Sequence, residues 1–141
     1  MAFDTSSDII TDVPTAARTR PWREVEDEAV DRDPALREIV YARALASAIA
    51  RAVLLHRTRH GLTQAALGRT LGMPQPHVAR LELGEHVPSL DTLLRIADAL
   101  GLAIDISVRP RADGRRPAPR ARRGAIVETT DQLVIEVRPA R

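Results

Sequence analysis

The sequence predicts a mainly helical protein with a long N-terminal helix and a short C-terminal strand or hairpin. Three observations lead to this fold class. Hydrophobic residues make up 44% of the 141 residues but aromatic residues only 2%, so Leu, Ile, Val and Ala must fill the core, which favours closely packed helices. Apolar residues recur at helical spacing, and glycines follow the ends of these stretches. Strand-like alternation appears only near the C-terminus.

The first third of the chain is polar at its start and then becomes helical. Residues 1–20 are rich in Ser, Thr and Asp and have no sustained period, so we expect disorder there. Residues 21–33 form an acidic segment in which Pro21 opens a short helix over residues 22–30. This segment contains Trp22, which we expect to be a packing anchor; the alternative is an exposed interface role.

Asp33 and Pro34 together predict the start of a long helix, with Asp as the N-cap and Pro in the first turn. The helix should run to about Arg59, because Gly61 follows as a C-terminal stop. Its expected apolar positions are Leu36, Ile39, Val40, Leu45, Ala48, Ile49, Ala52 and Val53.

Three short helices are expected next, each ended by a glycine. They cover residues 64–71, 75–83 and 90–100, and the glycines are Gly72, Gly84 and Gly101. Thr63 is positioned to cap the first of them. We therefore place one helical domain at residues 34–108, closed by a half-buried strand over residues 104–108.

The C-terminal part consists of a basic run and two short apolar stretches. Residues 109–124 alternate Pro, Arg and Gly, as a flexible linker does, and the same run suits non-specific phosphate binding. Residues 125–141 contain two stretches, 125–128 and 133–137, that are compatible with a hairpin. Since an isolated hairpin is only marginally stable, we expect a partner to supply its packing surface.

Composition excludes several classes of chemistry. The net charge of +2 conceals segments of −5, +2 and +5 over residues 1–35, 36–108 and 109–141. All basic residues are Arg, so Schiff-base and Ser/Lys mechanisms are excluded, and the absence of Cys excludes thiolate nucleophiles and disulfides. We expect no enzyme and no cofactor. We also expect no membrane segment, because no apolar run reaches about 18 residues, and hence a cytoplasmic protein.

Residues 64–82 have the layout of a helix-turn-helix motif. Leu67, Leu71, Met73, Val78 and Leu81 are spaced to bury against one another. Gly68 permits close approach of the two helices, and Gly72 permits a left-handed turn between them.

The face left exposed by this packing carries hydrogen-bonding side chains. Gln75, at the front of the second helix of the motif, has the amide that pairs with adenine N6 and N7 in a major groove. Gln64 should brace Gln75 or bind a phosphate, while His77 and Arg80 continue the exposed face. Arg80 suits guanine or a phosphate.

Residues 61–102 resemble the Xre/Cro, or lambda-repressor-like, family, including its paired glutamines Gln64 and Gln75. The resemblance implies five packed helices, a homodimer, and a palindromic double-stranded operator whose half-sites lie about one DNA turn apart. Pro74 and Pro76 depart from the family pattern around the recognition helix, and Glu85 stands where a phosphate contact is common. The candidate DNA-binding residues are Thr63, Gln64, Arg69, Gln75, Pro76, His77 and Arg80.

A broader resemblance over residues 22–108 is to HigA-like antitoxins, which bind a RelE-like or HigB-like toxin and repress their own operon. It implies that the acidic helix faces a basic toxin. The candidate partner-binding residues are Trp22, Glu24, Glu26, Asp27, Glu28 and Asp31. The alternatives are a stand-alone repressor and a protein-interaction module with weak DNA contact.

His56 and His60 stand four residues apart, as two metal ligands on one helix face would. No third ligand is evident, and histidine near a helix C-terminus is favourable through the helix dipole alone. We therefore expect no metal site.

Overall fold

The computed structural model describes residues 21–109, 122–130 and 132–140. The helices and strands, in chain order, are α1 (Trp22–Arg32), α2 (Pro34–Arg59), α3 (Gln64–Leu71), α4 (Gln75–Leu83), α5 (Leu90–Leu100), β1 (Leu102–Val108), β2 (Ile126–Thr129) and β3 (Leu133–Pro139). The mainly helical fold class with C-terminal strands is confirmed. The Arg-rich run and the N-terminal 20 residues fall largely outside the described part.

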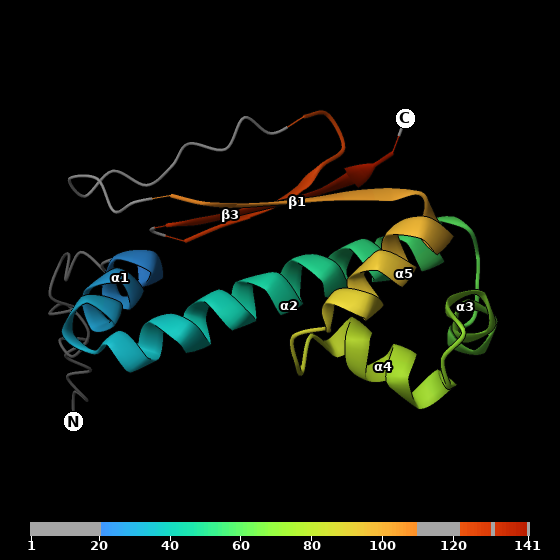
Figure 1. Cartoon of the computed structure of the whole chain (residues 1–141), viewed down its shortest axis with the longest axis horizontal. Helices are drawn as coiled ribbons and strands as arrows, with labels where there is room; N and C mark the ends of the chain where they lie inside the picture. Colours follow the sequence, from blue (N-terminus) through green and yellow to red (C-terminus); the bar gives the residue numbers. More distant parts are fainter. Residues whose placement is uncertain (1–20, 110–121, 131, 141) are drawn as a thin grey trace, which may run out of the picture.

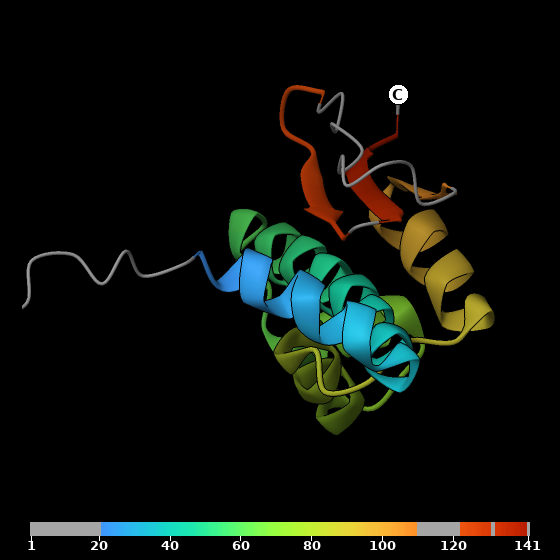
Figure 2. The ribbon, with the colours of Figure 1, turned by 90° about the vertical axis from the view of Figure 1, so that its left-hand side faces the viewer.

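The long helix α2 is the axis of the molecule (Figure 1). Helix α1 folds back along the first half of α2, and α3, α4 and α5 gather around its second half. The strands form a separate layer on one side of the helices (Figure 2). The helix-turn-helix motif therefore lies at the end of the molecule opposite α1.

Local sequence signals fix the helix ends. The side chain of Asp33 accepts a hydrogen bond from the Ala35 amide at 2.9 Å, and that of Thr63 from Ala66 at 3.1 Å. These N-caps satisfy amides that have no partner within the helix. The predicted bounds of α2 to α5 are confirmed, whereas α1 extends two residues beyond its predicted end.

The fully buried residues of α2 lie in its central and C-terminal part. Its buried residues are Ala46, Ala48, Ile49, Ala50, Ala52 and Val53. The predicted apolar face was wrong at Leu36 and Ile39, which are 37% and 61% exposed. The reason is tertiary, since the motif and the sheet pack mainly against the other end of the helix.

Helix α2 is also long and apolar enough, by length and composition, to span a membrane. Its 26 residues include an 18-residue window of mean hydropathy 1.4. This corrects the expectation that no such stretch exists. Because Ile49 and Val53 are fully buried in the same core as Leu67 and Ile135, the helix serves here as a core helix.

The strands form one antiparallel sheet in the order β1-β3-β2. The central strand β3 buries Leu133, Ile135 and Val137 in the core shared with α2 and the motif. Tyr41 on α2 donates to Gln132 Oε1 at 2.9 Å beside the β2–β3 turn. The hairpin was expected to need a partner's surface, and this was wrong, because β1 and α2 of the same chain supply it.

Strand β1 differs from its predicted alternation. It begins at Leu102, two residues before the predicted start, and pairs Ile104 with Val137 of β3. Ile106 and Val108 were expected on a half-buried face but are 45% and 74% exposed. Helix α2 packs against β2 and β3, so the outer part of this edge strand lies beyond the helical layer.

Candidate DNA-binding surface

The corner between α3 and α4 is made by two glycines. Gly72 has a φ of 62°, in the left-handed region, and ends α3. A Cβ atom on Gly68 would lie 2.6 Å from the carbonyl oxygen of Met73, so only glycine fits at this contact. Val78 and Leu81 of α4 are buried against Leu67. Both glycine roles predicted from the sequence are confirmed.

The corner presents Gln75 at the first position of α4, where the residue is exposed. Pro74 occupies the N-cap without a side-chain hydrogen bond, and Pro76 lies in the first turn. A proline there costs little, because first-turn amides have no helical acceptor. The front of α4 is therefore uncapped by side chains and open to solvent.

Gln75 belongs to a chain of hydrogen bonds that ends in an ion pair. Its Nε2 donates to Gln64 Oε1 at 2.8 Å, which is the first of the two roles predicted for Gln64, and Gln64 Nε2 donates to Glu82 Oε2 at 2.9 Å. Glu82 in turn accepts from Nε and Nη2 of Arg57 on α2. We call these four residues the polar network. It fixes which way each amide points.

Arg57 and Glu82 were not among the predicted site residues. The side chains of Glu82 and Arg57 are only 6% and 20% exposed, and the hydrogen bond to Glu82 raises the pKa of the Arg57 guanidinium above its ordinary value. A signal for Glu82 existed, because a residue seven positions after Gln75 lies about two turns along the same helix face. No sequence signal pointed to Arg57, since its partner Glu82 is 25 residues away on another helix.

Comparison with known proteins fits this geometry. The Helix-turn-helix family model matches residues 55–106. An uncharacterized HTH-type transcriptional regulator of Haemophilus influenzae is 31% identical over 85 residues, which are 60% of this chain and 82% of that protein. The chain belongs to the helix-turn-helix family of transcriptional regulators. The uncharacterized HTH-type regulator YgzD of Bacillus subtilis is 39% identical over 49 residues, 35% of this chain and 74% of that protein.

Membership in the helix-turn-helix family confirms the resemblance to Xre/Cro proteins and gives the chain its general role. It is a DNA-binding transcriptional regulator and not an enzyme. The motif that the family model matches includes α3, α4 and the polar network.

The other predicted DNA-binding residues of this helix-turn-helix protein lie around Gln75. Thr63, Arg69, Pro76, His77 and Arg80 are exposed, and Gln64 is half-buried. Arg69 and Gln75 line one shallow depression between α3 and α4. Neither Arg69 nor Arg80 forms an ion pair with another described residue. Both guanidinium groups can therefore pair with an anionic group of a ligand.

The predicted partner-binding residues lie on α1, far from the motif (Figure 1). Trp22 is 73% exposed, which contradicts a packing role for it. Glu24 and Asp31 are exposed, Glu26 and Glu28 are half-buried, and Glu28 pairs with Arg32 at 3.4 Å. The side chain of Asp27 is outside the described part.

The two histidines near the end of α2 stack on each other, with ring centroids 4.2 Å apart. Burial, and secondarily the neighbouring His60, lower the pKa of His56 below the ordinary 6.5. Among the residues that the structure describes, no group of three or more His, Asp or Glu is arranged to hold a metal ion.

Proposed function

We propose that this regulator is a sequence-specific repressor that inserts α4 into the major groove of a palindromic operator. The observation that carries the proposal is the exposed amide of Gln75, held by Gln64 at the front of α4. Occupation of a promoter by such a protein blocks transcription.

The polar network suits Gln75 to adenine. Its Nε2 donates one hydrogen to Gln64. The second Nε2 hydrogen and Oε1 make no hydrogen bond to another described residue, so both can bond to a base. Adenine offers an acceptor at N7 and a donor at N6 to a bidentate amide. Because Gln64 in turn is held by Glu82, the amide of Gln75 is oriented before DNA arrives, which lowers the entropy cost of binding.

The charges around Gln75 suit phosphates and a neighbouring base. We assign Arg69, Thr63 and His77 to the backbone and Arg80 to guanine or a phosphate. Glu85, exposed just after α4, opposes the phosphates electrostatically. We therefore expect electrostatic attraction to the phosphates to contribute only modestly to the DNA affinity of this regulator.

Selection of bound sequences from random duplexes, followed by footprinting, tests the proposal. We expect a palindrome whose half-sites lie about one helical turn apart and contain an adenine at one position. Recovery of unrelated sequences with no shared half-site would contradict it.

A palindromic site requires a dimer, and α5 offers a surface for it. Leu90 and Leu94 are 71% and 58% exposed and share one face of the helix through their four-residue spacing, and Leu83 at the end of α4 is 71% exposed. We infer that a second copy covers these leucines. Leu94→Asp should produce a monomer in sedimentation experiments, whereas Ala99→Asp, at another exposed position of α5, should not.

An antitoxin role is the second candidate, and the exposed Trp22 on an acidic helix favours it. Aromatic residues exposed in this way are typical of interface anchors. The experiment starts from a small reading frame beside the gene that encodes a basic, toxic protein. Relief of this toxicity by the wild-type regulator but not by Trp22→Ala would support the antitoxin role. Full relief by Trp22→Ala would contradict the assignment to α1, and absence of such a frame would favour a stand-alone repressor.

A further inference from the structure

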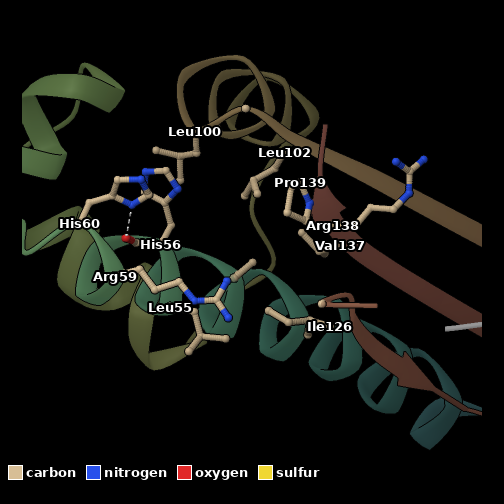
Figure 3. Close-up of a pocket in the computed structure, with 13 residues that line it drawn as sticks. Leu55, His56, Arg59, His60, Leu100, Leu102, Ile126, Val137, Arg138 and Pro139 are labelled. Carbon is tan, nitrogen blue, oxygen red and sulfur yellow. Dashed lines mark hydrogen bonds between the residues drawn. The ribbon is translucent and has the colours of Figure 1, made fainter. Parts of the chain in front are cut away.

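A pocket of about 200 Å³ lies between the second half of α2, the α5–β1 junction and the sheet (Figure 3). Its apolar walls include Leu55, Leu100, Leu102, Ile126 and Val137. Four cationic or titratable side chains also line it, and no Asp or Glu does. They are His56, Arg59, His60 and Arg138.

One of these side chains carries a charge without an ionic partner among the described residues. Arg138 is paired with Asp105 at 3.2 Å and lies near Glu136, and its guanidinium points away from the pocket (Figure 3). Arg59 forms no ion pair with another described residue and lies along α2 beside Leu55. Because the pKa of His56 is lowered, its imidazole is mainly neutral near pH 7 and serves as a hydrogen-bonding group.

We propose that this pocket binds a small carboxylic acid with an apolar body. The body lies against the leucines and Val137, and the carboxylate faces Arg59 and the imidazole of His56. An enclosed cavity of roughly 150 Å³ holds benzene, so the available volume fits one ring with a short acidic arm. The apolar walls disfavour an inorganic anion, which would lose its hydration there.

Binding of phenylacetate to the full chain without DNA tests the proposal. We expect saturable NMR shifts of the Leu100, Leu102 and Val137 methyl groups and of the His56 ring. Arg59→Gln should weaken binding about fivefold to tenfold, as expected for a partly exposed charge pair. Arg43→Gln, an exposed arginine of α2 outside this pocket, should leave the affinity unchanged.

Two further probes separate charge from shape. Phenylacetamide has the same body without the charge and should bind about as weakly as phenylacetate binds to Arg59→Gln, and inorganic phosphate should produce no shift of the methyl groups. The proposal is overturned if phenylacetate gives no saturable shift. Equal affinities of acid and amide, or of wild type and Arg59→Gln, would overturn it as well.

The position of the pocket suggests that its ligand regulates DNA binding, an extension that rests on the proposed function. His56 directly precedes Arg57, the end of the polar network that orients Gln75. A ligand that joins α2 to the sheet acts on the same helical turn. We expect saturating phenylacetate to change operator affinity by about fivefold or more.

This second experiment is distinguishable from the first. If phenylacetate binds but operator affinity stays unchanged, the regulatory extension is wrong and the binding site stands. If no operator is found, the proposed function fails while the titration without DNA still decides on the pocket.

Discussion

At the scale of single residues, Glu82 connects the exposed end of α4 to the interior. Its carboxylate accepts from two nitrogens of Arg57 and from the amide of Gln64, while its side chain is 6% exposed. A buried carboxylate needs such partners, because an unpaired charge there is strongly destabilising. The same residue thus stabilises the domain and orients the amide proposed to contact DNA.

Glu82→Gln should lower both stability and operator affinity. The neutral amide accepts fewer hydrogen bonds from Arg57 and presents its own NH₂ group to the donors around it. We expect the melting temperature to fall by several degrees and DNA binding to weaken at least fivefold, as measured by calorimetry and fluorescence anisotropy. Glu38→Gln, at an exposed acid on α2, is the control. Wild-type behaviour of Glu82→Gln would show that the network is incidental.

Contacts between residues of one short motif could be predicted from the sequence. The contact of Gln64 with Gln75 followed from their spacing within two adjacent short helices. The pairing of Arg57 with Glu82 did not, because it joins α2 to α4. Long side chains that meet across the fold leave no periodic signal in the chain.

At the scale of elements, the close approach of α3 and α4 determines where Gln75 lies. A methyl group at residue 68 meets the Met73 carbonyl, which cannot rotate away as a flexible side chain would. Gly68→Ala should therefore destabilise the protein by about 1–3 kcal/mol in urea unfolding. Thr70→Ala, exposed on the same helix, should have a much smaller effect. Equal stabilities of the two variants would contradict the close contact.

The end of α2 should make stability depend on pH. The pKa of His56 is lowered in the folded state, so the unfolded chain takes up a proton more readily as pH falls below about 6.5. Stability therefore rises with pH up to that value and is lost on acidification. His56→Gln should flatten this slope, whereas His77→Gln, exposed on α4, should not. Identical slopes in wild type and His56→Gln would be inconsistent with the burial of this group.

Helix ends were predictable, and exposure along α2 and β1 was not. Caps such as Asp33 and Thr63 act within one turn, so the sequence reveals them directly. The exposure of Ile39 and Ile106 depends instead on how far the neighbouring layers extend. Apolar periodicity identifies the type of element but not which part of it is covered.

At the scale of the whole molecule, the C-terminal sheet is part of the core. Ile135 is fully buried and belongs to the same cluster as Ile49 and Leu67. Ile135→Ala should reduce the free energy of unfolding by about 2–5 kcal/mol. Because helices and sheet unfold together, it should lower the melting temperature of both. Val134→Ala, half-buried on the same strand, is the matched control. If the helices of Ile135→Ala, followed by circular dichroism, melted at the wild-type temperature, a core shared by helices and sheet would be contradicted.

The tertiary pairing of the sheet was beyond prediction because β1 and β3 are separated by the Arg-rich run. Their register, with Ile106 opposite Ile135, depends on packing over α2 and not on a local turn. Deletion after Arg109 would remove β2 and β3 together with the Arg-rich run. The salt dependence of DNA binding should therefore be compared between wild type and a chain with Arg-to-Gln substitutions within residues 111–120.

The proposed repressor depends on the amide of Gln75 reading one base. Operators substituted singly at every half-site position should be titrated with wild type and Gln75→Ala. We expect wild type to lose about 1–3 kcal/mol of binding free energy when one adenine is replaced, and Gln75→Ala to lose this preference at that position alone. An unchanged base preference in Gln75→Ala at every position would show that Gln75 does not read the operator.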